Sequence, residues 1–369
     1  MSTCRISLPY DVIVEILEST VWWPRDLYRL SLVSTSWLFY TRKLLYAKPA
    51  LASFPACVHF ARTVQTNPRL ISTFVKGIEL CPTWADRDVA SRRYGAEEMH
   101  AIRIILGLNG LRTLVLGGEM SVCAERFLHC LIYSHDVEEL TIDGSLIAHS
   151  LSTRPSLEWD EVIACKLASV QKLRFVRIEL EVLPVLTHGS PYRFHQLTEL
   201  VVDNVEVISG NLPWLLQDTT TLKHLWVSGD SSSEVDEHVR LVLESYNIES
   251  LHYQVSTFSW NLTLFEDDFA STHSLRSLHL DGVRIDSEIL RMIHARCPAM
   301  EQLYISGRYV PLTREDWIGC IASGLFPALR RLGLPEGTFC PPLTFTKWTA
   351  SLEPALQKAC SRRGVRLLC

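Results

Sequence analysis

A short pattern of apolar residues recurs along most of the chain: in each stretch of six residues, the first, fourth and sixth are apolar. Clear examples are VKGIEL from Val75, LRTLVL from Leu111 and LKHLWV from Leu222. Side chains alternate between the two faces of a strand, so apolar residues at the fourth and sixth positions predict a strand with one buried face. The ten copies begin at Val75, Leu111, Val137, Val170, Leu197, Leu222, Ile248, Leu275, Met300 and Leu329.

The spacing of these copies predicts a stacked repeat. From Leu197 onward, successive copies begin 25 to 29 residues apart, and the earlier intervals reach 36 residues. Helical patterns over residues 287–293 and 315–321 lie between strands, and Pro298 and Pro327 follow them. A repeat of about 20 to 29 residues is similar to leucine-rich repeats. We predict an α/β fold in which strand–turn–helix units stack into an irregular solenoid with a parallel sheet on its concave face. An ordinary α/β domain with leucine-rich strands is the alternative.

The first fifty residues follow a helical period instead. Apolar residues recur at helical spacing over residues 12–17. Pro24 ends this first helix, Asp26 can begin a second, and Ser34 can cap a third that extends to about residue 46. Three short helices bury little surface by themselves, so we expect this segment to pack against something else.

This segment resembles the F-box family, and its fungal members most closely. The family pattern opens with Leu-Pro, continues with apolar residues at helical spacing, and closes on a Val followed four positions later by Trp. Many members have a basic residue just before the tryptophan, where this chain has Thr35 and Ser36. An amphipathic helical cap on a larger domain is the alternative, because a cap needs the same apolar residues for its core. The matching residues are Leu8, Pro9, Val12, Ile13, Ile16, Leu17, Leu27, Leu30, Val33 and Trp37.

The resemblance implies a docking function. An F-box binds the Skp-type adaptor of a cullin–RING ubiquitin ligase, and the rest of the chain selects a protein substrate. Apolar anchors at helical spacing suit such a contact. The chain would then be a non-catalytic substrate-recognition subunit; the alternative is a leucine-rich-repeat interaction scaffold that acts outside a ubiquitin ligase. The implied adaptor contacts are Leu8, Pro9, Ile13, Ile16, Leu17, Leu27, Leu30, Val33 and Trp37.

We expect three regions along the chain. Residues 1–51 form the F-box, and residues 52–110 form a linker and an irregular first repeat, with a candidate helix over residues 96–105. Residues 111–369 form the leucine-rich-repeat-like solenoid with a C-terminal cap.

The strand pattern also predicts a binding surface. The fifth residue of each copy lies between two buried positions, so its side chain points to the opposite, concave face. In four successive copies this fifth residue has a ring side chain, and tryptophan and tyrosine are enriched in protein interfaces. The alternative is that they only cover apolar backbone. In four successive copies the fifth residue is Trp226, His252, His279 or Tyr304, and His224 lies two residues before Trp226.

Composition and charge narrow the choice of partners. Apolar residues make up 47% and charged residues 21% of the chain, and the net charge of -5 gives no basic surface for nucleic acid. The longest segment without a charged residue, 250–265, is shorter than the roughly 20 residues of a membrane span. Charged residues interrupt the first apolar stretch, unlike a secretory signal. We expect a protein of the cytoplasm or nucleus that binds neither membrane nor nucleic acid.

No metal, cofactor or catalytic site is predicted. The eleven cysteines are scattered and form no CxxC pair, which indicates reduced thiols. Cys57 with His59, and His294 with Cys297, do not reach four zinc ligands at the required spacing. G-x-S-x-G and G-x-G-x-x-G motifs are missing from the sequence. An enzyme on an α/β scaffold is therefore the least favoured of the three hypotheses.

Overall fold

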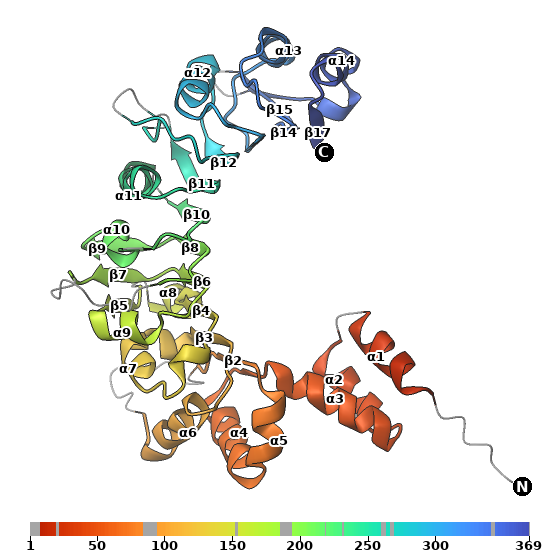
Figure 1. Cartoon of the computed structure of the whole chain (residues 1–369), viewed down its shortest axis with the longest axis vertical. Helices are drawn as coiled ribbons and strands as arrows, with labels where there is room; N and C mark the ends of the chain where they lie inside the picture. The colour runs from red at the N-terminus through yellow and green to blue at the C-terminus, as the bar shows by residue number, and fades with distance from the viewer. Residues whose placement is uncertain are drawn as a thin grey trace, which may run out of the picture. The chain divides into compact units, whose positions relative to one another are not determined.

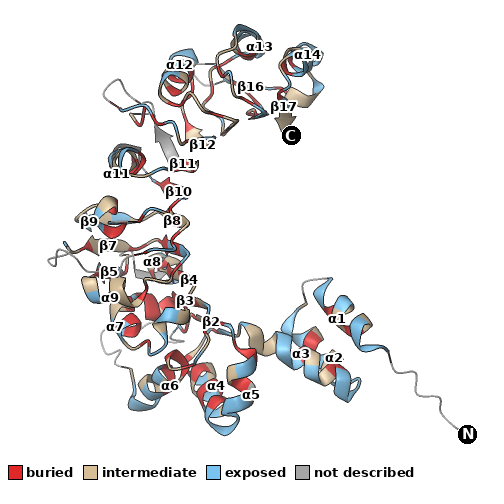
Figure 2. Cartoon of the chain, in the orientation of Figure 1, coloured by how far each residue is buried: buried red, intermediate tan, exposed pale blue. Residues whose placement is uncertain are grey.

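In the computed structural model the chain forms two compact units, Met1–Leu140 and Thr141–Cys369. The structure describes residues 8–19, 22–83, 94–151, 154–184, 194–217, 219–230, 232–259, 263–265, 269–340 and 344–368. Buried residues occur along both units (Figure 2). The domain boundaries expected after residues 51 and 110 stay predictions.

The first unit begins with three helices, α1 (Tyr10–Glu18), α2 (Pro24–Ser31) and α3 (Thr35–Ala47). Pro24 begins α2, where its missing N–H has no helical partner to lose. The Ser34 hydroxyl caps α3 by accepting a hydrogen bond from the Trp37 backbone N–H, at 3.4 Å. We call residues 8–47 the three-helix module. Its core consists of Ile13, Leu17, Leu27 and Trp37, with Ile16, Trp22, Leu30, Tyr40 and Leu45 packed around them.

The rest of the first unit combines short parallel strands with helices. Strands β1 (Ala50–Leu51), β2 (Gly77–Leu80) and β3 (Thr113–Gly117) pair in that order. The helix expected over residues 96–105 is present as α6 (Ala96–Leu106). The guanidinium of Arg62, in α4 (Phe54–Thr66), lies 2.7 Å from the carboxylate of Glu97 in α6. The remaining elements are α5 (Pro68–Phe74), the 3₁₀ turns η2 (Gly118–Ser121) and η3 (Ser134–Asp136), and α7 (Ala124–His129). Strand β4 (Glu139–Asp143) includes the last two residues of the first unit and the first three of the second.

A parallel sheet runs through the second unit, and its strands follow one another in chain order (Figure 1). Equivalent residues of successive copies pair across it: Leu225 faces both Leu200 and Leu251. Parallel neighbours need a crossover between them, and most crossovers here contain a helix. The strands are, in spatial order, β6 (Lys172–Val176), β8 (Glu199–Asp203), β10 (His224–Gly229), β11 (Ser250–Ser259), β12 (Ser277–Val283), β13 (Gln302–Ser306), β14 (Arg331–Gly333) and β17 (Arg366–Leu368).

Helices and two smaller sheets complete the second unit. The Asp286 carboxylate caps α12 (Ser287–Arg296) by accepting hydrogen bonds from two backbone N–H groups at 3.1 Å. Thr313 and Asp316 form a reciprocal capping box at the start of α13 (Arg314–Ser323). The helices are α8 (Ser145–Leu151), α9 (Glu161–Lys166), α10 (Leu212–Leu215), α11 (Ser232–Ser245), α12 (Ser287–Arg296), α13 (Arg314–Ser323) and α14 (Pro354–Arg362), with the 3₁₀ turn η4 (Ala350–Leu352). The small sheets are the parallel β5 (Ser156–Trp159), β7 (Glu179–Val182) and β9 (Glu206–Ser209), and the antiparallel β15 (Gly337–Cys340) and β16 (Thr344–Lys347).

The α/β class with a large parallel sheet is confirmed. Every copy of the six-residue pattern forms a strand that begins at its third residue. The fourth position is buried in each copy, and the sixth is buried in all but the last, where Leu334 is half-buried. The helices expected at residues 287–293 and 315–321 are present as α12 and α13. Within the described part of the chain, no helix has the length and apolar character needed to cross a membrane.

Candidate functional site

Four aromatic side chains lie in a row on adjacent strands of the second unit. Trp226 of β10 pairs in register with His252 of β11. His252 pairs in turn with His279 of β12, and His279 pairs with Tyr304 of β13. Successive ring centroids are 4.3, 4.0 and 4.3 Å apart. We call these four residues the aromatic row. The register predicted from the sequence is confirmed, and substrate binding by the row stays a prediction.

The aromatic row lies on the opposite face of the sheet from the buried leucines. The Trp226 side chain is 42% exposed, whereas Leu225 next to it is 2% exposed. Tyr304 is 37% exposed, and the two histidines between them are half-buried. His224 is exposed and, two residues before Trp226, lies on the same face. The structure therefore brings all five residues nominated for substrate binding onto one accessible face.

Burial makes the centre of the row electrically neutral. It lowers the pKa of His252, and it lowers the pKa of His279 to about 4, with the neighbouring His252 adding to the shift. The carboxylate of Asp281 acts in the opposite direction on both rings. A ring nitrogen of His279 (Nε2) lies 3.2 Å from the Ser306 hydroxyl. At neutral pH the row thus offers uncharged rings, suited to apolar and aromatic groups.

The two ends of the row differ. At one end Tyr304 pairs with Gly333 of β14, and a Cβ added to Gly333 would lie 1.9 Å from a ring atom of Tyr304. Only glycine leaves room for the ring in this position. Toward the other end, Arg174 of β6 lies 3.9 Å from Asp203 of β8. The row therefore ends at one side with the Tyr304 ring next to Gly333. At the other side, beyond Trp226, lies the ion pair of Arg174 and Asp203.

The low pKa of His279 predicts a pH-dependent stability. Between about pH 6.5 and pH 4 the unfolded chain binds a proton at this residue and the folded chain does not, so stability falls as the pH drops. We expect a lower melting temperature at pH 5 than at pH 7 and a smaller difference in His279→Gln, measured by differential scanning calorimetry. His135→Gln is the matched control at an exposed site and should keep the original difference. If His279→Gln shows the same difference in melting temperature between pH 5 and pH 7 as the original chain, the low pKa assigned to His279 is contradicted.

The structure divides the nine implied adaptor contacts into three groups. Leu8, Pro9 and Val33 are exposed, Val33 by 64%. Ile16 and Leu30 are half-buried at the edge of the core. The other four hold the module together and present little surface to a partner while it is folded: Ile13, Leu17, Leu27 and Trp37.

The three-helix module exposes more apolar surface than the nine residues suggested. Large apolar side chains normally lie exposed singly, and a dense group of them marks an interaction surface. Six of those exposed here were not nominated from the sequence. Helical spacing could not have singled them out, because Tyr10 lies three residues before Ile13 and Leu44 seven residues after Trp37, at the same spacing as the core residues. The exposed side chains are Leu8, Tyr10, Trp23, Tyr28, Leu32, Val33, Phe39 and Leu44.

A pocket of about 600 Å³ lies between α1 and α3 of the same module. Tyr10, Tyr40 and Leu44 contribute apolar surface to it, and the rings of Tyr10 and Tyr40 meet edge to face at 4.8 Å. Glu15 and Lys43 add opposite charges at its border. The module therefore has a hollow in addition to its exposed apolar surface.

Cys57 and Cys297 are deeply buried. Burial raises the pKa of the Cys57 and Cys297 thiols to about 12, which keeps both protonated and unreactive at neutral pH. Cys57 is buried and His59 is exposed, so these two sequence neighbours are differently placed. Over the residues that the structure describes, no three His, Cys, Asp or Glu side chains are grouped so that they could hold a metal ion.

Two surfaces are therefore candidates for function: the exposed apolar side chains of the three-helix module and the aromatic row. No protein-family model matches the chain, and no curated protein matches it significantly.

Proposed function

We propose that the chain is the substrate-recognition subunit of a Skp–cullin–F-box type ubiquitin ligase. The three-helix module acts as the F-box and binds the Skp-type adaptor, which links the chain to a cullin–RING ligase. Residues 111–369 act as an irregular leucine-rich-repeat solenoid with a C-terminal cap and bind the protein substrate. Such a subunit works in the cytoplasm or nucleus and has no catalytic residues, because the reactive cysteine belongs to a ubiquitin-conjugating partner.

The observation that carries this proposal is the exposed apolar surface of the three-helix module. Its core is complete without these side chains, since Trp37 and the residues around it are already packed. Leu32 is 71% exposed and Trp23 is 69% exposed. Exposed side chains of this size and number on so short a segment are explained by a partner that covers them.

Substrate binding is assigned to the aromatic row. Its four rings lie within contact distance of their neighbours and form a continuous strip across four strands. Tryptophan and tyrosine dominate the energetics of many interfaces because they bury a large area at a low cost in side-chain entropy. A strip of this length suits an extended peptide segment or the edge of one domain.

Affinity capture of the tagged full-length chain tests the proposal. We expect the Skp-type adaptor and a cullin in the captured material. The double variant Leu8→Ala and Pro9→Ala should lose both partners, because these exposed residues lie at the start of the module. Ile132→Ala should retain both partners, because Ile132 is exposed but lies outside the module. Full recovery of the adaptor by the double variant would contradict docking through this surface. Recovery of the adaptor without any cullin would favour a scaffold acting outside a ligase.

A further inference from the structure

A second pocket, of about 370 Å³, lies in the second unit away from the aromatic row. Its walls come from the ends of β8 and β10, the start of β9, and helices α10 and α11. Small-molecule sites in proteins have volumes of about 300–1,000 Å³, and in parallel sheets they lie beyond the carboxyl ends of the strands. Val205, Val207, Val235 and Leu212 give the pocket an apolar lining.

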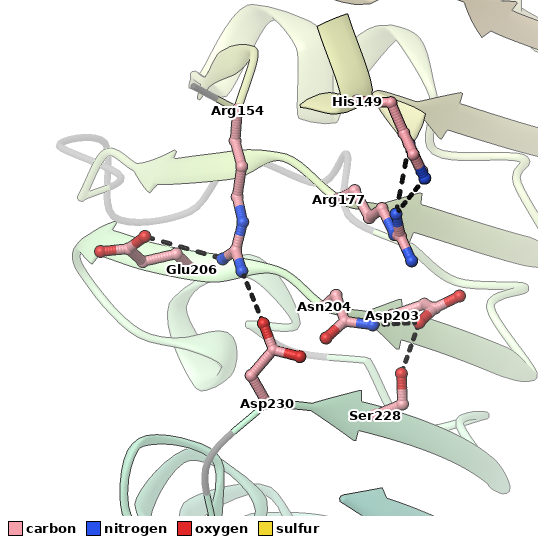
Figure 3. Close-up of polar contacts among 8 residues, drawn as sticks. All are labelled: His149, Arg154, Arg177, Asp203, Asn204, Glu206, Ser228 and Asp230. Atoms are coloured by element: carbon pink, nitrogen blue, oxygen red, sulfur yellow. Dashed lines mark hydrogen bonds and ion pairs between the residues drawn. The ribbon is translucent and has the colours of Figure 1, made fainter. Parts of the chain in front are cut away.

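Two polar atoms at this pocket are buried and have no hydrogen-bond partner in the described structure: Oδ1 of Asn204 and Nδ1 of His238. The Asn204 amide is held in place because its Nδ2 donates to Asp203 at 3.1 Å. Figure 3 shows the Asn204 oxygen turned away from Asp203, toward the side where Asp230 lies. A buried polar atom without a partner destabilises the empty site, and a bound hydrogen-bond donor would remove that cost.

The charges around the pocket favour a cation. The Arg154 guanidinium lies between two carboxylates, 3.6 Å from Glu206 and 3.4 Å from Asp230 (Figure 3). Glu237 adds a third carboxylate to the lining. Burial lowers the pKa of His238, so its ring is neutral and does not offset them. The acidic groups therefore outnumber the one arginine in the lining.

We infer that this pocket binds a small organic amine: its apolar body packs on the valines, and its ammonium group donates to Oδ1 of Asn204 and competes with Arg154 for the carboxylates. The inference does not depend on the proposed ligase function, because it uses neither the three-helix module nor the aromatic row. An anionic ligand is disfavoured, since Arg154 is already paired with two carboxylates.

Three probes that share one apolar body test the inference on the full-length chain: 2-phenylethylamine, 2-phenylethanol and phenylacetate. Binding is followed by isothermal titration calorimetry and by the NMR signals of labelled valine methyl groups. We expect the amine to bind with a Kd of about 0.1 mM, within the range for a ligand of this size. The alcohol should bind at least 5-fold more weakly and phenylacetate weakest of all. The methyl signals of Val205, Val207 and Val235 should shift.

Two variants act in opposite directions. Asn204→Gly removes the acceptor oxygen and keeps the backbone, because Asn204 has a φ of 53° that glycine adopts readily; it should weaken amine binding at least 5-fold. Arg154→Met removes the competing cation. It should tighten amine binding at least 3-fold and leave the affinity for the alcohol unchanged. Surface ion pairs contribute little to stability, so this variant should stay folded, as its valine spectrum will show.

Three results would overturn the inference. One is equal affinity for the amine, the alcohol and phenylacetate. Another is the lack of any shift in the pocket valines at 5 mM amine, which would mean that the pocket holds only water. The third is unchanged amine affinity in both Asn204→Gly and Arg154→Met.

Discussion

Replacing Leu225 with alanine is expected to lower the free energy of unfolding by about 2–5 kcal/mol, whereas replacing Trp226 is expected to cost less than about 1 kcal/mol. Leu225 is 2% exposed and packs in the core, so its truncation leaves a cavity. Trp226 is 42% exposed on the opposite face, so its truncation leaves none. Denaturant unfolding of both full-length variants measures the difference.

The same pair of variants separates stability from binding. Trp226→Ala should weaken capture of the substrate by at least about 1 kcal/mol, and Tyr304→Ala should do the same. Leu225→Ala should affect capture only through unfolding. A stable Leu225→Ala chain together with an unfolded Trp226→Ala chain would mean that the aromatic row belongs to the core.

Replacing Trp37 with alanine is expected to destabilise the three-helix module by about 3–5 kcal/mol. Trp37 is 8% exposed and packs with Ile13, Leu17 and Leu27 at the centre of the module. Hydrogen exchange followed by mass spectrometry should show rapid exchange throughout α1, α2 and α3. The second unit should keep its protection, because none of its residues belongs to the core cluster of the three-helix module.

Trp23→Ala is the matched control for this variant. Trp23 is 69% exposed, so its loss should leave hydrogen exchange in the module unchanged. Rapid exchange of the module in Trp23→Ala, with protection kept in Trp37→Ala, would contradict the packing described here.

The main sheet could be predicted from the sequence because strands alternate strictly between two faces. The repeated leucines, such as Leu225 and Leu251, set the buried face, and their equivalent positions in successive copies set the register of the strands. The aromatic row then followed from position alone, since each ring lies between two buried residues. Part of the core of the three-helix module could also be predicted, because helical spacing places Ile13 and Leu17 on one face of α1, which packs against Trp37 of α3.

Other features had no such signal. Strands β5, β7 and β9 form their sheet from segments that lack the repeated pattern, so nothing in the sequence aligned them. The need for glycine at position 333 depends on a ring from the neighbouring strand, and the pocket at Asn204 depends on residues that are far apart in the chain. Contacts of this kind are set by tertiary packing, which a single sequence does not display.

Titration of a purified Skp-type adaptor into the full-length chain tests the central claim most directly. The account predicts a Kd below about 1 µM, at least 10-fold weaker binding by Val33→Asp, and unchanged binding by Ile132→Asp. Both substitutions place a charge at an exposed apolar site, 64% exposed at Val33 and 66% at Ile132, but only Val33 lies in the three-helix module. No binding at about 10 µM adaptor, or equal loss of binding in the two variants, would contradict the account.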